Sequence, residues 1–462
     1  MSQPAAACCC NWGCRAGRGF DGLRSVRLSG TSLCMTDTMT APAQDLGETM
    51  LEMGRRARAA SRALGRMTPA DRTRGLMAVA AAIRAAAPKI LSANEQDMSA
   101  AREKGLDAAM LDRLALDASR LEGIAASVEA VAGLGDPIGR ELARWTRPNG
   151  LDIARVAVPL GVIGIIYESR PNVTADAGAL CLRSGNAAIL RCGSESTHSS
   201  RAIVAAMRDA LKAEGLPEDA VQLVMTTDRA AVGHMLAGLE GNVDVIVPRG
   251  GRSLVERVQK DARVPVIGHL EGLCHVIVDK AADPDKAVSI VLNAKMRRTG
   301  ICGSAETLLV DAAVAATLLP KIAAALMEAG CELRGDDRAR AIVPDMATAT
   351  EADWSTEYLA PILAVAVVDD LTAALDHIGT WSSGHTECII TEDAAAADRF
   401  FASVDSAILL HNASTQFADG GEFGMGAEIG IATGRIHARG PVGADQLTTY
   451  KYVVRGTGQV RP

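Results

Sequence analysis

Two series of short apolar runs alternate with amphipathic segments along most of the chain, and this alternation constrains the fold more than any other feature. The first series starts at "PLGVIGIIYE" and continues through "AAILRCG", "AVQLVM" and "VDVIVPRG". The second starts near "VPVIGHLEGLCHVIVD" and includes "ETLLVD", "ILAVAVVD", "CIIT" and "AILLHN". Helical patterns separate these runs, for example over residues 175–184 and 199–215. Because strands that alternate with helices form parallel sheets, the sequence predicts two α/β domains.

Three further segments lie outside this alternation. Residues 51–132 are Ala-rich, with apolar residues every three or four positions, which predicts helices. Two alternating runs then flank Asn149-Gly150, a strong signal for a β-hairpin. The tail "LTTYKYVVR" alternates like a strand but has no partner adjacent in sequence. We expect the hairpin and the tail to pair between subunits.

Composition excludes several classes of partner. A net charge of −7 argues against nucleic acid, because phosphate binding needs a basic face. No apolar run approaches the ~18 residues that would span a bilayer, so no membrane partner is expected. The cysteines after residue 180 are scattered without paired spacing, which favours a reducing compartment, and we expect a soluble cytoplasmic protein. Residues 1–38 lack periodicity and are interpreted as a disordered extension or a mis-assigned start.

Cys302 is the candidate nucleophile. In "NAKMRRTGICGSAETLLV" it lies between Gly300 and Gly303, just before an apolar strand. The cationic neighbours Lys295, Arg297 and Arg298 are expected to lower the pKa of the thiol, as reactive cysteines require. An unreactive turn cysteine also fits this pattern. A histidine adjacent in space would favour a nucleophile, but the sequence names none, and His275 in "LCHVIVD" is interpreted as a core residue.

Two other positions suggest ligand contacts. Gly250 and Gly251 follow a predicted strand and open a helix, which favours phosphate binding but also suits an ordinary helix entry. Asn172, in "YESRPNVTAD", follows a buried strand and precedes a helix. Its amide could contact a ligand at the end of the strand or cap the helix. The chain has no Walker A motif and no His-Glu-x-x-His or Cys-x-x-Cys pair, so no metal site is predicted.

Four stretches together resemble the gamma-glutamyl phosphate reductase family of the aldehyde dehydrogenase superfamily. They are "VPLGVIGIIYESRPNVTADAGALCLRSGNAAILRCGSES", "NAKMRRTGICGSAETLLV", "TQFADGGEFGMGAEIG" and "HARGPVGADQLTTYKY". The resemblance extends from about Met50 to the C-terminus. It implies an aldehyde dehydrogenase-like α/β fold with two parallel-sheet domains and an oligomerisation element. The implied parts are an NADP-binding domain (residues 39–140 and 159–268), a catalytic domain (269–430) and an oligomerisation element (141–158 and 431–462).

The resemblance also implies an activity, namely NADPH-dependent reduction of L-glutamyl 5-phosphate to L-glutamate 5-semialdehyde in proline biosynthesis. Cys302 would form a thioester as phosphate leaves, and Asn172 would bind the oxyanion together with the Cys302 N–H. The implied cofactor contacts are Arg191 at the adenosine ribose, Glu357 at the nicotinamide ribose, and Gly250 and Gly251 near the pyrophosphate. A homodimer or higher homo-oligomer is expected, and the resemblance raises an association with glutamate 5-kinase.

The chain departs from the family pattern near the nucleophile. Many members have Pro shortly before the cysteine and Asn after it, where this chain has Thr299-Gly300 and Gly303. Glu271 lies near the place of the Glu that activates water in hydrolytic aldehyde dehydrogenases, but a reaction with phosphate as acyl acceptor does not need that water. Two alternatives therefore stay open: another NAD(P)-dependent aldehyde dehydrogenase, and a catalytically silent homologue.

Overall fold

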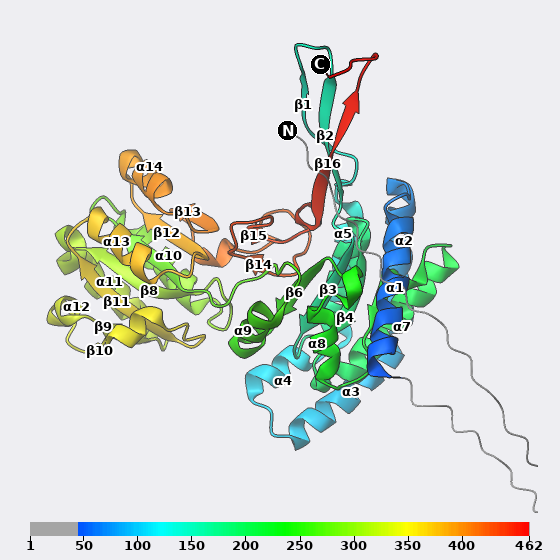
Figure 1. Ribbon diagram of the computed structural model, residues 1–462. Helices are drawn as coiled ribbons and strands as arrows, with labels where there is room; N and C mark the ends of the chain where they lie inside the picture. The colour runs from blue at the N-terminus through cyan, green and yellow to red at the C-terminus, as the bar shows by residue number, and fades with distance from the viewer. Residues whose placement is uncertain (1–44, 462) are drawn as a thin grey trace, which may run out of the picture. The chain divides into compact units, whose positions relative to one another are not determined.

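The computed structural model describes residues 45–461, and the chain from Asp45 onward forms one unit (Figure 1). The expectation for residues 1–38 lies outside this described part. Within it, no single helix is long and apolar enough to cross a membrane. One bent pair of consecutive helices, Pro69–Ala85 and Ala87–Glu103, passes the same test when its members are taken together, by length and composition only.

The Ala-rich segment forms five helices, as its periodicity predicts. They are α1 (Leu46–Leu64), α2 (Pro69–Ala85), α3 (Ala87–Glu103), α4 (Ala108–Leu114) and α5 (Ala118–Gly133). Side-chain caps fix where several of them begin. At α2, Thr68 and Asp71 exchange hydrogen bonds in a capping box, so two backbone donors of the first turn are satisfied. Apolar residues of α1, α2, α3 and α5 then join the first hydrophobic core.

That core surrounds a four-stranded parallel sheet of order β5-β4-β3-β6. The strands are β3 (Val162–Tyr167), β4 (Ala187–Arg191), β5 (Val221–Leu223) and β6 (Val245–Arg249). The helices between and after them are α6 (Pro171–Arg183), α7 (Thr197–Ala213), α8 (Ala230–Leu236) and α9 (Arg252–Asp261). Every residue of β3 is buried, which explains its uninterrupted apolar sequence.

A second parallel sheet has seven strands in the order β10-β9-β11-β8-β7-β12-β13. The strands are β7 (Cys274–Val278), β8 (Ala305–Asp311), β9 (Glu332–Gly335), β10 (Ala347–Thr348), β11 (Ile362–Val368), β12 (Thr386–Ile390) and β13 (Ile408–His411). The helices are α10 (Pro284–Met296), α11 (Ala312–Glu328), α12 (Asp337–Ile342), α13 (Leu371–Trp381) and α14 (Ala394–Ser403). Successive strand residues enter separate cores, since Leu308 packs with α10 and α11 whereas Leu309 packs with α13 and α14. Both faces of the sheet are thus covered.

The hairpin and the tail form a third, three-stranded sheet of order β1-β2-β16. β1 (Glu141–Thr146) and β2 (Asp152–Pro159) are antiparallel around Asn149-Gly150, which confirms the predicted hairpin. β16 (Thr448–Arg455) pairs with β2 of the same chain along its whole length, as Figure 1 shows. The expectation that these strands pair between subunits is therefore wrong. The chain itself supplies the partner, because the segment before the tail returns to the first core.

The returning segment lies between residues 429 and 447. It contains a short antiparallel pair, β14 (Ile431–Ala432) and β15 (Gly440–Pro441). Ile429, Val442 and Leu447 are buried in the first hydrophobic core, and the Leu447 carbonyl accepts a hydrogen bond from Asn186 Nδ2 at 2.8 Å. These contacts place the start of β16 beside the end of β2.

Candidate active site

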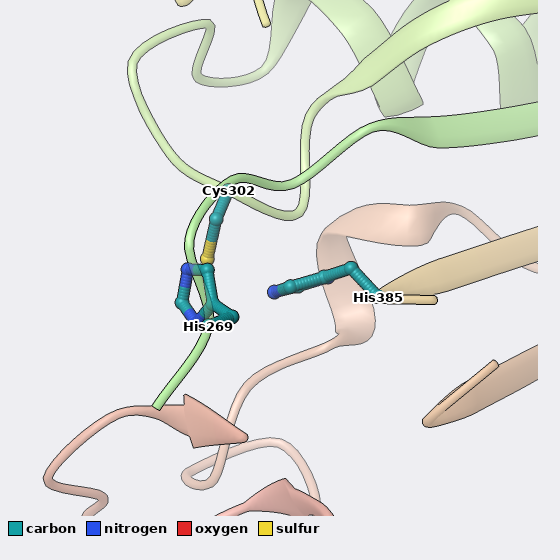
Figure 2. A group of neighbouring side chains, drawn as sticks. All are labelled: His269, Cys302 and His385. Carbon is teal, nitrogen blue, oxygen red and sulfur yellow. The ribbon is translucent and has the colours of Figure 1, made fainter. Parts of the chain in front are cut away.

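Three potentially reactive side chains stand just before three neighbouring strands. Cys302 precedes β8, His269 precedes β7 and His385 precedes β12, and the sheet order is β8-β7-β12. Because these strands are parallel, their amino ends meet at one edge of the sheet. The donor atoms of the three side chains lie within 4.8 Å of one another, and Figure 2 shows His385 pointing toward the Cys302 side chain.

Hydrogen bonds orient the two imidazoles differently. His269 Nδ1 lies 2.6 Å from the Ile431 carbonyl, which can only accept, so Nδ1 carries a proton and Nε2 is left for the thiol. His385 Nδ1 lies 2.9 Å from Thr386 Oγ1. His385 is completely buried, and within the described residues its Nε2 has no hydrogen-bond partner. A buried polar atom of this kind is costly unless something binds it, as the neighbouring thiolate or a substrate would.

The histidines activate the thiol. Burial alone would raise the pKa of Cys302, but the adjacent imidazoles of His385 and His269 bring it well below its ordinary value. Burial likewise lowers the pKa of His269, yet its hydrogen bond and charge interaction with Cys302 outweigh this, and the pKa of His269 is raised. The two shifts describe a thiolate–imidazolium pair, the reactive form of a catalytic cysteine. A Cys and two His could also ligate a thiophilic cation, although the sequence predicts no metal site.

His269 and His385, rather than the expected Lys295, lower the pKa of the thiol. Lys295 lies buried on α10, and its Nζ is 2.6 Å from Glu306 Oε2, so a carboxylate already neutralises it. Burial raises the pKa of Glu306 to about 7, with Lys295 acting in the opposite direction. Glu306 Oε1 also accepts the Leu359 N–H at 3.3 Å. The ion pair therefore supports the loop that carries Glu357, while the imidazoles activate the thiol.

Glu357 lies close to the nucleophile turn. Its Oε1 accepts the Gly272 N–H at 2.9 Å, and Gly272 packs against the Cys302 backbone. Burial raises the pKa of Glu357, and the charge of Cys302 acts in the same direction. A carboxylate at this place could contact a cofactor ribose while the reactive ring lies at Cys302.

The other expected cofactor residues lie at the carboxyl edge of the four-stranded sheet, where ligands of such sheets bind. Arg191 ends β4, and Gly250 and Gly251 join β6 to α9. The Gly251 N–H donates to Glu168 Oε2 at 3.0 Å, and no side chain caps α9. Arg191 donates to the carbonyls of Cys192 and Thr227, but its buried Nε has no partner within the described residues. The unused donor of Arg191 suits an anionic nucleotide, whereas the Gly251 N–H is already bonded to the Glu168 carboxylate.

Asn172 does not cap a helix. α6 begins at Pro171 with Arg170 in the capping position, so Asn172 lies inside the first turn. Its Nδ2 donates to Asp176 Oδ2 at 3.0 Å, and both side chains line a cavity of about 420 Å³. No hydrogen bond joins Asn172 to Cys302 within residues 45–461, and one N–H of its amide remains for a ligand.

Two residues left outside the predicted site have structural partners. His275 is fully buried, and its Nδ1 lies 3.0 Å from Glu387 Oε2, as expected of a core histidine. Glu271 Oε2 accepts a hydrogen bond from Arg252 Nη1 at 2.5 Å and is held on the surface of α9.

Neither His269 nor His385 was predicted from the sequence. A usable signal was present, since Gly268 precedes His269 and Gly384 precedes His385, and each histidine lies a few residues before an apolar run. Cys302 has the same setting beside Gly303. Polar residues in glycine-containing turns before strands of one parallel sheet are candidates for a common edge, but which strands are neighbours is not evident from the sequence.

Comparison with known proteins gives consistent relatives. Residues 35–340 match the model described as the aldehyde dehydrogenase family. A gamma-glutamyl phosphate reductase from Hyphomonas neptunium is 76% identical over 428 residues, which are 93% of this chain and 100% of that protein. One from a Caulobacter species is 66% identical over 417 residues, 90% of this chain and 100% of that protein.

A solved structure agrees with these relatives. The crystal structure of gamma-glutamyl phosphate reductase from Thermotoga maritima has a TM-score of 0.87 to this chain at 45% sequence identity. The similarity covers 89% of this chain and 100% of that one. It therefore includes both parallel sheets and the three-stranded sheet rather than one shared domain.

Proposed function

Because the chain belongs to the aldehyde dehydrogenase family, and within it to the gamma-glutamyl phosphate reductases, we propose that it is an oxidoreductase of proline biosynthesis. The expected aldehyde dehydrogenase-like α/β fold is confirmed. The proposed reaction reduces L-glutamyl 5-phosphate to L-glutamate 5-semialdehyde with NADPH and releases phosphate. The observation that carries this proposal is the thiol of Cys302, activated by two histidines at the edge of the second sheet.

In the first half of the reaction, the Cys302 thiolate attacks the acyl carbon of the substrate. A C–S bond forms, the C–O bond to phosphate breaks, and phosphate leaves with the bonding electron pair, so that a thioester remains. His269 and His385 keep the thiol ionised before the attack. Cys302 is only half-buried, so the acyl phosphate can reach its thiolate at this edge of the second sheet.

In the second half, the thioester is reduced and released. NADPH, when bound, supplies the hydride for the thioester carbon. The resulting tetrahedral oxyanion expels the Cys302 thiolate, which the imidazoles again stabilise, and the aldehyde leaves. We assign the Cys302 N–H and the free N–H of Asn172 to the oxyanion in both halves, a role typically worth ~3 kcal/mol of barrier.

The residues assigned to NADPH fit such a group. Gly250 and Gly251 would lie along the pyrophosphate, because neither has a side chain that would keep a ligand away from the backbone at the start of α9. Arg191 would contact the adenosine ribose and its phosphate, and its unused Nε–H supports this assignment. Glu357 would hold the nicotinamide ribose beside the nucleophile turn.

We also propose a homodimer or higher homo-oligomer, a cytoplasmic location and an association with glutamate 5-kinase. The three-stranded sheet carries exposed apolar side chains that a second copy would cover: Trp145, Tyr450, Tyr452 and Val454. The six cysteines of the described residues are free thiols, which suits a reducing compartment. The kinase association rests on the family resemblance alone.

Phosphate-dependent reduction of NADP with L-glutamate 5-semialdehyde tests the proposal in the reverse direction. The wild-type protein should require both phosphate and the semialdehyde, and Cys302→Ala should lose about 10³-fold or more of this activity. Turnover that continues without phosphate would indicate another kind of aldehyde dehydrogenase. Substantial activity in Cys302→Ala would show that the thiol is not the nucleophile, and an inactive wild type would support a silent homologue.

A further inference from the structure

A cavity of about 420 Å³ separates α4 and α5 from the start of α6 and from the turn that leads to Cys302. Arg113, Arg170 and Arg298 line it from these three segments. Asn172 and Asp176 line it from α6. Parts of the chain far apart in sequence thus bring charged groups to one space, and neither the fold nor the thiol chemistry requires them there.

The three arginines have no carboxylate partner. Within residues 45–461, none of Arg113, Arg170 and Arg298 forms a salt bridge, whereas Arg120 on the same wall pairs with Asp112 at 2.6 Å. Burial, together with the charges of Arg249, Arg113 and Arg298, lowers the pKa of Arg170 to about 10. Like charges gathered without a counterion are unfavourable, and a bound anion would remove this repulsion.

Asp176 is the complementary group. Its carboxylate accepts hydrogen bonds from Ser127 Oγ at 2.9 Å and from Asn172 Nδ2 at 3.0 Å, both of which are neutral. Burial raises the pKa of Asp176 despite these bonds. The carboxylate therefore lacks a cation of its own, and two oxygens can accept further hydrogen bonds.

The cavity adjoins the nucleophile. Arg113 Nη2 lies 3.6 Å from the position that a Cβ would take on Gly300, two residues before Cys302. Arg298 precedes the same turn, and the charge of Cys302 influences Arg170. A molecule with its reacting carbon at Cys302 can therefore extend into the cavity.

We propose that this cavity recognises the α-amino acid end of the substrate. Arg113 and Arg298 bind the α-carboxylate, Asp176 binds the α-ammonium, and Arg170, which lines the cavity at the start of α6, faces the acyl phosphate. The charges are complementary, because the substrate has two anionic groups and one cation, and the cavity lining has three cations and one anion apart from the Arg120–Asp112 pair. This inference rests on the proposed function and adds the groups that distinguish an amino acid aldehyde from other aldehydes.

The test compares aldehydes that differ only in the head group. L-glutamate 5-semialdehyde has both charged groups, 5-oxopentanoate lacks the amine, and butanal lacks both. Each is oxidised in the reverse direction with phosphate and NADP by the wild type and by Asp176→Asn, Arg298→Gln and Arg113→Gln. Each variant is compared with the wild type on the same substrate. Cyclisation of the amino aldehyde therefore lowers the free substrate concentration equally in both assays and does not affect the comparison.

We expect Asp176→Asn to raise KM for L-glutamate 5-semialdehyde about tenfold or more and to leave KM for 5-oxopentanoate within about twofold. The arginine variants should raise KM for both carboxylate substrates by a similar factor and leave KM for butanal unchanged. Arg120→Gln is the matched control, because Arg120 also lines the cavity but is already paired with Asp112. This variant should leave KM for all three aldehydes at its wild-type value. Unchanged alkylation of Cys302 shows that the variants keep the fold.

Two results would overturn the inference. If Asp176→Asn or the arginine variants raise KM for all three substrates by the same factor, these residues support the fold and do not recognise the head group. The proposed function would still stand. If the wild type oxidises butanal as well as the semialdehyde, with no phosphate requirement, the proposed function fails together with the inference.

Discussion

Gly272 packs directly against the backbone carbonyl of Cys302, so closely that a Cβ at position 272 would overlap that group. The same glycine donates its N–H to Glu357 Oε1 at 2.9 Å. The Cys274 Sγ approaches the Cys302 carbonyl at 3.1 Å from the other end of this segment. The turn before β7 therefore holds the nucleophile and the expected ribose carboxylate in one arrangement.

Replacing Gly272 should disturb catalysis more than stability. In Gly272→Ala the new methyl group must displace the Cys302 turn, and a shift of ~1 Å in a reacting group can cost about 10²-fold in rate. Steady-state kinetics and thermal unfolding measure the two effects. Gly379→Ala, which adds a methyl group into open space, is the control and should keep full activity. Normal turnover in Gly272→Ala would mean that the turn is not held by this contact.

The histidine pair should make Cys302 reactive at unusually low pH. The pKa of its thiol is lowered, so the thiolate persists as pH falls below the ordinary cysteine value of ~8.5 and is lost only at the lowered pKa. Alkylation by iodoacetamide, followed by mass spectrometry of the Cys302 peptide, should therefore stay fast at pH 7. His385→Gln should move the midpoint of the pH dependence of this alkylation to higher pH.

Other cysteines provide an internal control in that experiment. Burial raises the pKa of Cys181 and of Cys388 to about 12, so both should remain unmodified over the same range. A wild-type midpoint near 8.5 for Cys302 would contradict the thiolate–imidazolium pair.

Asn172 should act in the transition state. If its free N–H binds the oxyanion, Asn172→Ala lowers kcat by ~10²-fold and changes KM little. The matched variant is Ser127→Ala, which removes the other hydrogen bond to Asp176 at 2.9 Å but no oxyanion donor. If both variants raise KM equally and leave kcat unchanged, Asn172 only orients Asp176, and its assignment to the oxyanion is wrong.

The buried ion pair should contribute stability in a pH-dependent way. Lys295→Met leaves the Glu306 carboxylate buried without a cation, which typically costs ~3–5 kcal/mol. The folded-state pKa of Glu306, about 7, exceeds the unfolded value of ~4.3, so its contribution to the free energy of unfolding declines as pH rises through that window. Without Lys295 the pKa rises further and the decline extends to higher pH.

Urea denaturation at pH 5 and pH 8 measures this effect. Lys295→Met should lose more stability relative to the wild type at pH 8 than at pH 5. At pH 8 the buried Glu306 carboxyl, which no longer has a cation beside it, must either ionise unpaired or keep a proton that it would release in the unfolded state, and both cost free energy. The double variant Lys295→Met/Glu306→Gln should recover most of the loss, because no buried charge remains. An equal loss at both pH values would exclude Glu306 as its origin.

The three-stranded sheet should support the oligomer. Removing residues 447–462 takes away β16, exposes the edge of β2 and should give monomers or aggregate. Tyr452→Lys is a milder change, since the side chain is 57% exposed and a charge there opposes burial against a second copy. Sedimentation at micromolar concentration checks both. A monomeric intact protein would refute the idea.

Local sequence determined the elements. The uninterrupted apolar run of β3 and the helical period of α2 depend on which faces of a single segment are buried, so they could be predicted one segment at a time. The hairpin followed from Asn149-Gly150, whose backbone preferences are local. Cys302 was identified because its glycine neighbours and the family resemblance lie within one short stretch.

Tertiary structure decided what surrounds these elements. His269 and His385 meet Cys302 only because β7 lies between β8 and β12, and strand order in a parallel sheet is set by packing between distant segments. For the same reason the nearby Lys295 proved to be committed to Glu306, and β16 found its partner in its own chain. The sequence determined that Cys302 could be a nucleophile, whereas the sheet order determined which groups ionise it, because charges act across short distances in space and not along the chain.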